Sequence, residues 1–282
     1  MKKGLIMEGG AMRGIFTCGV IDVFLENNIE FDGAIGVSAG AAFGCNYKSR
    51  QIGRAFRYNS KYCNDKRYSS IWSLITTGDL YNAKFCYEDL IYRLDPWDRE
   101  AYVKNPMEFH CVVSNVETGK AEYHNCVNGD EEDILWIRAS ASIPVFSRPV
   151  EIHGKKYLDG GSTDSIPLEY FESIGYDRNV VIETQPIEYR KEKQKFLGLI
   201  RIVLHKYPNL VHALSIRYKM YNHEKEYIHQ KEQQGSVYVI RPESSLNIKS
   251  NTKDSNELKR VYELGRMAGL KHLENVKKFL QE

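Results

Sequence analysis

Residues 31–40, FDGAIGVSAG, contain the turn that decides the fold of this chain. The run over residues 31–37 is short and mostly apolar, which predicts a buried strand, and it ends at Ser38. The small residues after Ser38 begin a predicted helix. Gly36, Ser38 and Gly40 therefore form a GxSxG motif at a strand-to-helix turn, a context in which the serine hydroxyl projects from the end of a sheet.

The same order of strand, turn and helix occurs once earlier, at the start of the chain. Leu5-Ile6-Met7 predicts a strand, residues 8–14 (EGGAMRG) a glycine turn, and residues 15–27 a helix. Later segments alternate in the same way, with strands expected at 109–113 and 180–182 and helices at 134–141 and 168–174. Alternating strands and helices are typical of layered α/β proteins, so we expect an α/β fold.

Length and composition exclude several other classes of protein. A chain of 282 residues has room for one or two domains, and 42% hydrophobic with 27% charged residues is the composition of a globular protein. The longest charge-free stretch, residues 33–47, is too short for a membrane span of about 20 residues. The N-terminus meets Glu8 after three apolar residues, so it lacks the apolar core of a signal peptide. We expect a cytoplasmic protein.

The six cysteines give no sign of disulfides or of a metal. They are spread without a CxxC pair, and the spacing of His124 and Cys126 matches no zinc site. We expect six reduced, mostly buried thiols, no metal and no cofactor.

The glycine turn at residues 8–14 admits three interpretations. A phosphate-binding P-loop needs a lysine and a hydroxyl residue after its last glycine, and here two apolar residues follow it. A dinucleotide-binding turn needs glycine where Ala11 stands, although Asp32 lies near the position of a ribose-binding acid. The third interpretation is an oxyanion hole, in which consecutive backbone amides bind the negative oxygen of an acyl intermediate. Only the third also explains Ser38.

A third motif, Asp159-Gly160-Gly161, follows a short predicted strand. An acid before two glycines is a common turn, and its meaning here comes from the order of the three motifs. A glycine turn after the first strand, a GxSxG turn after the second and a distant DGG, together with residues 139–146 (ASASIPVF), resemble the patatin-like phospholipase family. The resemblance covers roughly residues 4 to 185.

The resemblance implies a three-layer α/β/α fold with a central, mostly parallel sheet. It also implies a serine lipid acyl hydrolase of the phospholipase A, lysophospholipase or carboxylesterase type, acting on a phospholipid or another lipid ester. In this resemblance Ser38 matches the nucleophile and Asp159 the general base of a Ser-Asp dyad. The oxyanion turn matches a set of five residues, Gly9, Gly10, Ala11, Arg13 and Gly14.

Two departures from the family pattern affect the site. Ala11 stands where glycine is usual, and it can donate to an oxyanion if its backbone angles are ordinary, because the donor is a main-chain N–H. Asp164 follows Asp159 by five residues, so a second carboxylate competes for the role of the base. The base must be partly desolvated, since a carboxylate with an ordinary pKa of about 4 is a weak one.

Two alternatives to this function stay open. The first is a Ser-His-Asp esterase of the α/β-hydrolase kind, because five histidines follow Asp159 in the required order: His205, His212, His223, His229 and His272. The early position of Ser38 argues against it, and we expect these histidines at the surface. The second alternative is a non-catalytic protein that binds a lipid or a nucleotide, with Ser38 a remnant of the fold.

The last third of the chain differs from the rest in charge. Through residue 186 there are 20 Lys and Arg against 26 Asp and Glu, and after it there are 19 against 11. We expect a catalytic domain at 1–185 and a basic, mainly helical extension at 186–282, with helical segments over 196–233, one strand at 237–241 and a final helix at 255–280. A basic face is most often only solvated, and the functional alternative is peripheral association with an anionic membrane. We expect no nucleic-acid partner, and the sequence does not indicate an oligomeric state.

Aromatic residues concentrate between Phe56 and Tyr102, a segment that holds 11 of the 33 Phe, Trp and Tyr residues. The interpretation we favour is that helices pack these rings against the sheet. The alternative is an aromatic wall around a hydrophobic ligand.

Overall fold

The computed structural model describes residues 1–281. Within that range the framework is one eight-stranded sheet in the order β5-β6-β3-β2-β1-β7-β8, with β4 paired to β3. The strands are β1 (Lys2–Met7), β2 (Gly33–Val37), β3 (Glu108–Asn115), β4 (Ala121–Asn125), β5 (Val150–Ile152), β6 (Lys155–Asp159), β7 (Tyr176–Ile182) and β8 (Val237–Ile240). The five neighbours β3, β2, β1, β7 and β8 run parallel, whereas the pairings of β4, β5 and β6 are antiparallel.

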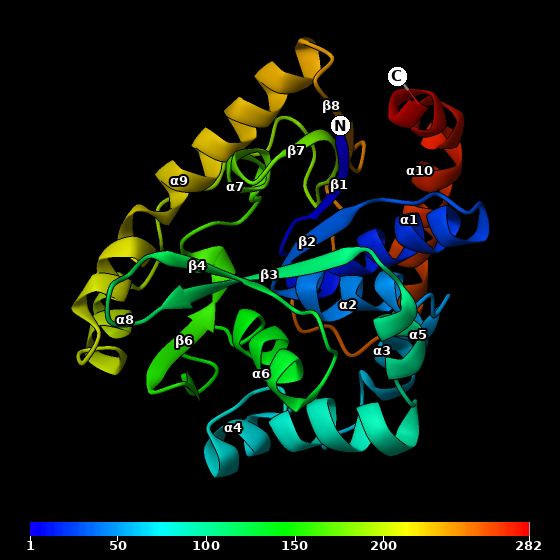
Figure 1. The fold of residues 1–282 in the computed structure, drawn as a ribbon. Helices are drawn as coiled ribbons and strands as arrows, with labels where there is room; N and C mark the ends of the chain where they lie inside the picture. The colour runs from blue at the N-terminus through cyan, green and yellow to red at the C-terminus, as the bar shows by residue number, and fades with distance from the viewer. Residues whose placement is uncertain (282) are drawn as a thin grey trace.

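Helices cover both faces of the sheet (Figure 1). The α-helices are α1 (Ile15–Glu26), α2 (Ala39–Lys48), α3 (Arg54–Tyr62), α4 (Ile71–Thr77), α5 (Arg99–Lys104), α6 (Glu131–Ser140), α7 (Leu168–Ser173), α8 (Leu197–Val203), α9 (Pro208–Gln233) and α10 (Ser255–Gln281). The other helical segments of the described residues are the short 3-10 helices η1 (Ala11–Gly14) and η3 (Gly160–Ser162) and the wider π-helix η2 (Phe85–Leu94).

The first strand shows how the sequence produces three layers. Successive side chains of a strand point to opposite faces, so Leu5 and Met7 join the core formed with α1, α2 and α10. Ile6 joins the core on the other face, where Phe171 of α7 and Tyr221 of α9 are buried. The predicted α/β/α fold with a mostly parallel sheet is confirmed.

The segment after residue 186 completes this framework. β8 pairs in parallel with β7 at the edge of the sheet, while α9 and α10 lie on opposite faces (Figure 1). α10 approaches α1 so closely that a Cβ at Gly265 would lie 2.0 Å from the main-chain oxygen of Phe16. The helical region expected at 196–233 divides into α8 and α9 at Pro208, because proline fits the first turn of a helix but not its interior.

Within residues 1–281, no helix combines the length and the apolar character that a membrane-spanning helix requires.

Candidate active site

Parallel pairing of the first two strands brings the two glycine turns together. Met7 pairs with Gly36, so the residues after each strand lie at the same edge of the sheet. β6 adds Asp159 at that edge, because Val113 of β3 pairs with Asp159. Ser38, Asp159 and the turn that begins at Gly9 therefore converge at the carboxyl ends of the parallel strands, the usual place for a site in open α/β sheets.

Ser38 has the strained backbone expected of the turn. Its φ and ψ angles are 55° and −119°, and α2 begins at the next residue. The turn needs glycine at position 40, because a Cβ there would lie 2.3 Å from the main-chain oxygen of Met7. The amide of Ser38 donates to Ser140 Oγ at 3.0 Å. The serine side chain is thus fixed at the positive end of α2.

The hydroxyl of Ser38 donates a hydrogen bond to Asp159. The Oγ to Oδ2 distance is 2.5 Å, and the other carboxylate oxygen accepts the amide of Gly161 at 2.8 Å. Burial raises the pKa of Asp159, while the bond from Ser38 and the charge of Arg217 lower it. Gly160 lets the strand end approach β3, because a Cβ there would lie 2.2 Å from the main-chain oxygen of Val112. The pair has the contact and the desolvated carboxylate that a serine-activating base requires.

Asp164 lies elsewhere. Its carboxylate accepts the hydroxyl of Tyr123 at 2.7 Å and interacts with Glu224 of α9. The carboxylate of Glu224 in turn accepts the amide of Ser165 at 3.1 Å. Asp164 and Glu224 line a different cavity from the one that contains Ser38. Asp159 is therefore the carboxylate in contact with the serine.

The first glycine turn presents free donors beside the serine. Within residues 1–281, the amides of Gly10 and Ala11 donate to no acceptor. A Cβ at Gly9 would lie 3.1 Å from the Ser38 Cβ, so the two turns are in close contact. Gly14 serves packing instead, since a Cβ there would lie 2.8 Å from the Cβ of Ala39.

The backbone of Ala11 is not ordinary. Its φ of 47° lies in the left-handed region, which favours glycine. The condition of ordinary backbone angles is therefore not met, and alanine occupies the position at a cost of about 1 to 2 kcal/mol. The main-chain N–H is still available as a donor.

Two cavities meet at Ser38, which lines both of them together with Ala11 and Ile143. The first has a volume of about 890 Å³, part of it open to solvent, and is mostly apolar. Its wall includes aromatic residues of the 56–102 segment, namely Tyr58, Tyr68, Tyr81, Tyr87 and Trp97. The second is larger, about 1300 Å³, and is lined by four cationic side chains.

The aromatic rings of the 56–102 segment combine the two interpretations given above. Tyr58, Tyr68 and Trp97 are buried as expected, yet the same rings form part of a cavity wall that reaches the serine. Buried packing and a wall around a hydrophobic ligand are not exclusive, because a ring can contact the core on one side and a cavity on the other.

The residues behind the alternative functions lie away from the serine. None of the five histidines lines either of the cavities that meet at Ser38, within the residues described. His205 is exposed, and His272 packs against Tyr238 at the other end of the chain. Asp32 precedes β2 and accepts the amide of Lys3, so it lies at the opposite end of the strands from the glycine turn.

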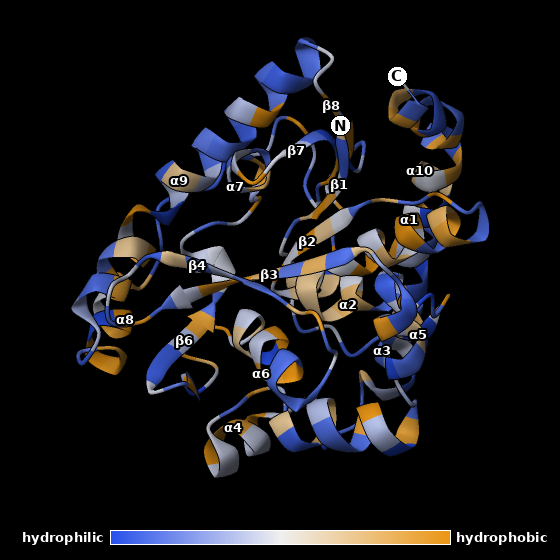
Figure 2. Cartoon of the chain, in the orientation of Figure 1, coloured by the Kyte–Doolittle hydropathy of each residue, from blue (hydrophilic) through white to orange (hydrophobic). Residues whose placement is uncertain are grey.

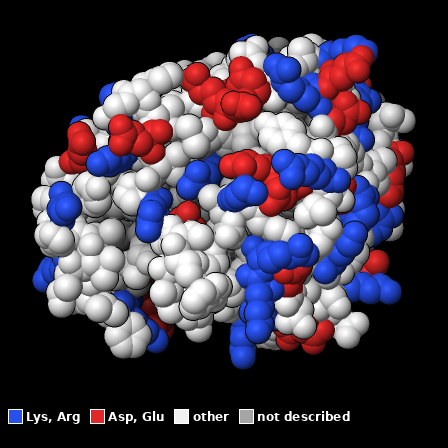
Figure 3. Space-filling model, turned by 90° about the horizontal axis from the view of Figure 1, so that it is seen from below, with Lys and Arg blue, Asp and Glu red and all other residues white. Residues whose placement is uncertain are grey.

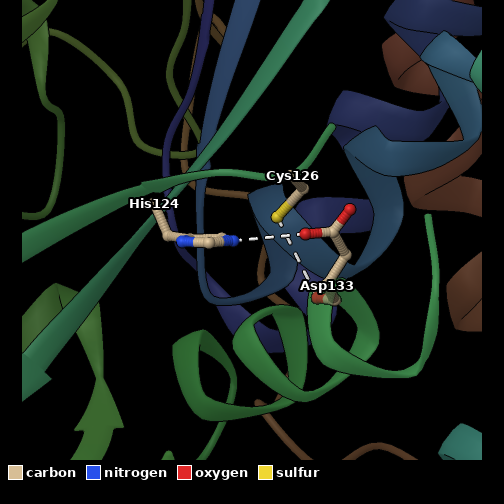
Figure 4. A group of neighbouring side chains, drawn as sticks. All are labelled: His124, Cys126 and Asp133. Atoms are coloured by element: carbon tan, nitrogen blue, oxygen red, sulfur yellow. Dashed lines mark hydrogen bonds and ion pairs between the residues drawn. The ribbon is translucent and has the colours of Figure 1, made fainter. Parts of the chain in front are cut away.

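His124, Cys126 and Asp133 form a group with metal-binding side chains (Figure 4). His124 Nε2 lies 3.2 Å from Asp133 Oδ1, and Asp133 Oδ2 accepts the amides of Asn128 and Gly129 at 2.7 Å. Burial raises the pKa of Cys126 well above that of an ordinary thiol, which favours the protonated form. These contacts close the loop between β4 and α6, and one oxygen of the carboxylate already accepts two main-chain amides.

Several residues at the site have no signal in the sequence. Ser140 lies within the 139–146 stretch, but nothing there indicates that its hydroxyl accepts from Ser38. Arg217 of α9 donates through Nε to the main-chain oxygen of Gly161, and Tyr221 donates to the buried Glu8 at 2.7 Å. A single arginine or tyrosine in a long polar helix resembles any surface residue, so only the packing of α9 identifies them.

Comparisons with known proteins identify the family of the chain. The family model described as patatin-like phospholipase matches residues 5–172, and a second, described as a domain of unknown function, matches residues 207–281. The chain belongs to the patatin-like phospholipase family. That membership supports a lipid acyl hydrolase, and a serine beside a buried carboxylate and a glycine turn is the constellation that this chemistry needs.

Individual relatives cover different parts of the chain. An uncharacterized protein YjjU of Escherichia coli is 28% identical over 99% of this chain and 79% of its own length. Lysophospholipase nte1 of Emericella nidulans is 28% identical over 66% of this chain, which spans only 12% of that enzyme. Among solved structures, VipD from Legionella pneumophila superposes with a TM-score of 0.50 at 12% identity, covering 97% of this chain and 67% of its own, which is a likeness of fold.

Proposed function

We propose that this protein is a serine hydrolase of lipid acyl esters that uses Ser38 and Asp159 as a catalytic dyad. The observation that carries the proposal is the 2.5 Å hydrogen bond from the Ser38 hydroxyl to a buried carboxylate, at the point where an apolar cavity meets a turn with free amides. The apolar cavity is suited to an acyl chain, because each buried methylene contributes about 0.8 kcal/mol to binding.

The proposed reaction follows from where the groups lie. Ser38 Oγ attacks the ester carbonyl and its proton passes to Asp159, while amides of the turn from Gly9 to Ala11 stabilise the oxyanion. The protonated Asp159 gives that proton to the departing alcohol, leaving an acyl-serine. Water then attacks the acyl-serine with Asp159 again as the base, and the fatty acid leaves as Ser38 regains its proton.

The test combines labelling with hydrolysis. A fluorophosphonate probe should label wild type and fail to label Ser38→Ala, because only an activated serine reacts. Asp159→Asn should lose ester hydrolysis by at least about a hundredfold, the usual contribution of a general base. Asp164→Asn is the matched control and should keep its activity, since Asp164 contacts Tyr123 rather than the serine. An active Asp159→Asn enzyme would overturn the dyad, and an unlabelled wild type would favour the non-catalytic alternative.

Peripheral binding to an anionic membrane is supported by an apolar surface at the mouth of the site. We define this surface as the exposed apolar residues of α4, of α8 with the residue before it, and Phe146, which lines the same cavity: Ile71, Trp72, Ile75, Phe146, Phe196, Leu199, Ile202 and Val203. Trp72 is 70% exposed and Phe196 81% exposed. Hydrophobic segments on both helices are visible in Figure 2.

The surface borders the second cavity and carries basic neighbours. Phe146, Phe196 and Leu199 line that cavity, and Leu80, just after α4, donates its amide to the oxygen of Phe146. Exposed Lys193, Lys195 and Arg201 lie beside or within α8, a combination that suits an anionic lipid surface. The lower left of Figure 3, where α4 faces the viewer, is largely uncharged.

Sedimentation with phosphatidylglycerol vesicles tests this part. The double substitution Trp72→Ser with Ile202→Ser should weaken binding at least about tenfold, since each buried side chain contributes about 1.5 kcal/mol or more. Met267→Ser is the control, because Met267 is also exposed but belongs to α10, which lies apart from α4 and α8 in Figure 1. Unchanged vesicle binding by the double variant, or binding that ignores salt, would count against the proposal.

A further inference from the structure

Among the residues described, most of the cations that line the second cavity form no ion pair with a carboxylate. Its lining includes Arg13, Lys191, Lys195 and Arg217, against the two acids Glu8 and Asp159. Lys195 is paired with Glu192 at 3.7 Å. Within residues 1–281, the other three cations have no ion pair.

Two of the three unpaired cations, Lys191 and Arg217, are held in place by protein contacts. The backbone of Lys191 is fixed by Asn222 of α9, which accepts its amide at 2.8 Å and donates to its carbonyl at 3.1 Å. The Lys191 ammonium lies 4.4 Å from the ring centre of Tyr221. Arg217 is tied to the main-chain oxygen of Gly161. The buried Nε of Arg13 has no hydrogen-bond partner.

The two acids of the cavity are already occupied by other groups. Glu8 is fully buried and accepts the amide of Thr184 and the hydroxyl of Tyr221. Asp159 accepts from Ser38 and from the amide of Gly161. Neither carboxylate is within ion-pair distance of the cations.

Crowding of the cations has an electrostatic consequence. The pKa of Lys191 falls to about 8, first because of burial and then because of the charge of Arg217, with a further contribution from Arg13. Like charges held together in a partly desolvated cavity are unfavourable until an anion binds among them. A phosphate group fits this requirement, because arginine and lysine form charge-assisted hydrogen bonds to its oxygens.

The position of Ser38 fixes which part of a substrate would meet the cations. An ester held at Ser38 with its acyl chain in the apolar cavity extends its alcohol part into the second cavity, because the two cavities share the serine. We propose that Lys191, Arg217 and Arg13 form a subsite for the phosphate of a glycerophospholipid, next to the ester that is cleaved. This inference rests on the proposed function and gives it a substrate class.

The proposal also assigns a role to the C-terminal part of the chain. Lys191 and Arg217 lie outside residues 5–172, and Arg217 lies within residues 207–281, whose family model is described as being of unknown function. Substrate selection by phosphate would then be a contribution of the segment after the patatin-like residues.

Two substrates that carry the same acyl chain, one with a phosphate and one without, test the subsite. They are monopalmitoylglycerol and the lysophosphatidate of the same chain, and kcat/KM is measured for both. Lys191→Gln should lower the value for lysophosphatidate by about tenfold or more, the usual effect of losing a charge-assisted hydrogen bond, and leave monopalmitoylglycerol unchanged. Lys191→Arg should recover most of the lost kcat/KM for lysophosphatidate. Lys219→Gln is the matched control, since Lys219 is exposed on α9 and does not line this cavity.

A binding measurement separates this inference from the proposed reaction. In Ser38→Ala, calorimetric titration with lysophosphatidate should give a dissociation constant that rises about tenfold on adding Lys191→Gln. An equal loss of kcat/KM on both substrates in Lys191→Gln would overturn the subsite, and so would a wild type without preference for lysophosphatidate. In either case fluorophosphonate labelling of Ser38 would still support the hydrolase. Inorganic phosphate that binds as tightly as lysophosphatidate would overturn the assignment to a lipid. An unlabelled, inactive wild type would overturn both proposals.

Discussion

Arg217 is positioned to set the pKa of the proposed base. Its Nη2 and Asp159 Oδ1 each lie 3.1 Å from the point that a Cβ at Gly161 would occupy, so the two atoms are at most about 6 Å apart. Unit charges about 6 Å apart interact by about 3 kcal/mol at an effective dielectric constant of about 20. Arg217 is partly exposed, so we halve this interaction energy to allow for solvent screening. The remaining energy corresponds to about one unit in the pKa of Asp159.

The perturbation is Arg217→Gln. Asp159 must be ionised to accept the serine proton, and the positive charge of Arg217 favours the ionised form. Removing that charge raises the pKa of Asp159, so the acid limb of kcat/KM against pH should move about one unit to higher pH. The assay is fatty-acid release from a soluble, uncharged short-chain ester, because such a substrate does not use the proposed phosphate subsite.

The controls separate charge from structure. Lys219→Gln removes a charge from an exposed position of the same helix and should leave the profile in place. Arg217→Lys keeps a positive charge, so its acid limb should lie close to that of wild type. A purely structural role of Arg217, through its bond to Gly161, would lower the plateau without moving the limb. A profile of folded Arg217→Gln that superimposes on wild type would refute the electrostatic reasoning.

Three further predictions concern stability and the first glycine turn. The pKa values of Asp164 and Glu224 are raised in the folded state, chiefly by burial, so the folded protein binds more protons than the unfolded chain and loses stability as pH rises above the ordinary carboxyl pKa. Glu224→Gln should therefore show a smaller fall in Tm with rising pH than wild type. Ala11→Gly should keep activity and change the unfolding free energy by less than about 1 kcal/mol, whereas Ala11→Val, disfavoured at φ 47°, should lose both activity and stability in urea titrations. Tyr221→Phe leaves the buried Glu8 short of a donor and should cost about 1 to 3 kcal/mol; an unchanged urea midpoint would contradict this.

The parts of the site that the sequence predicts are local ones. Ser38 sits in a motif whose glycines and flanking strand and helix are contiguous, so its geometry follows from a few neighbouring residues. The same holds for the turn after β1 and for Asp159 at the end of β6. Parallel strands end at one edge of a sheet, which is why these separate motifs meet in space.

The parts that the sequence does not predict depend on distant packing. Spacing alone left Asp164 as a competitor of Asp159, and only the contact with Glu224 of α9 shows that Asp164 belongs to another cluster. The left-handed φ of Ala11 is likewise seen only in the folded turn, since alanine itself does not favour it. Lys191 and Arg217 are isolated cations in polar segments, and no local pattern distinguishes them from solvated charges.

The packing also changes the interpretation of the excess of Lys and Arg in the last third of the chain. The excess of positive charge after residue 186 resembles a solvated face, yet buried contacts of that segment satisfy groups of the first part. Tyr221 donates to Glu8, Arg217 donates to the oxygen of Gly161, and Lys225 pairs at 2.7 Å with Glu183, which is 1% exposed. A buried carboxylate without its partner is strongly destabilising, so the acids at the strand ends require the basic helix beside them. The charge difference between the two parts is thus partly balanced by ion pairs that join them, as at Lys225 and Glu183, whereas Lys191 and Arg217 at the site form no ion pair within the described part of the chain.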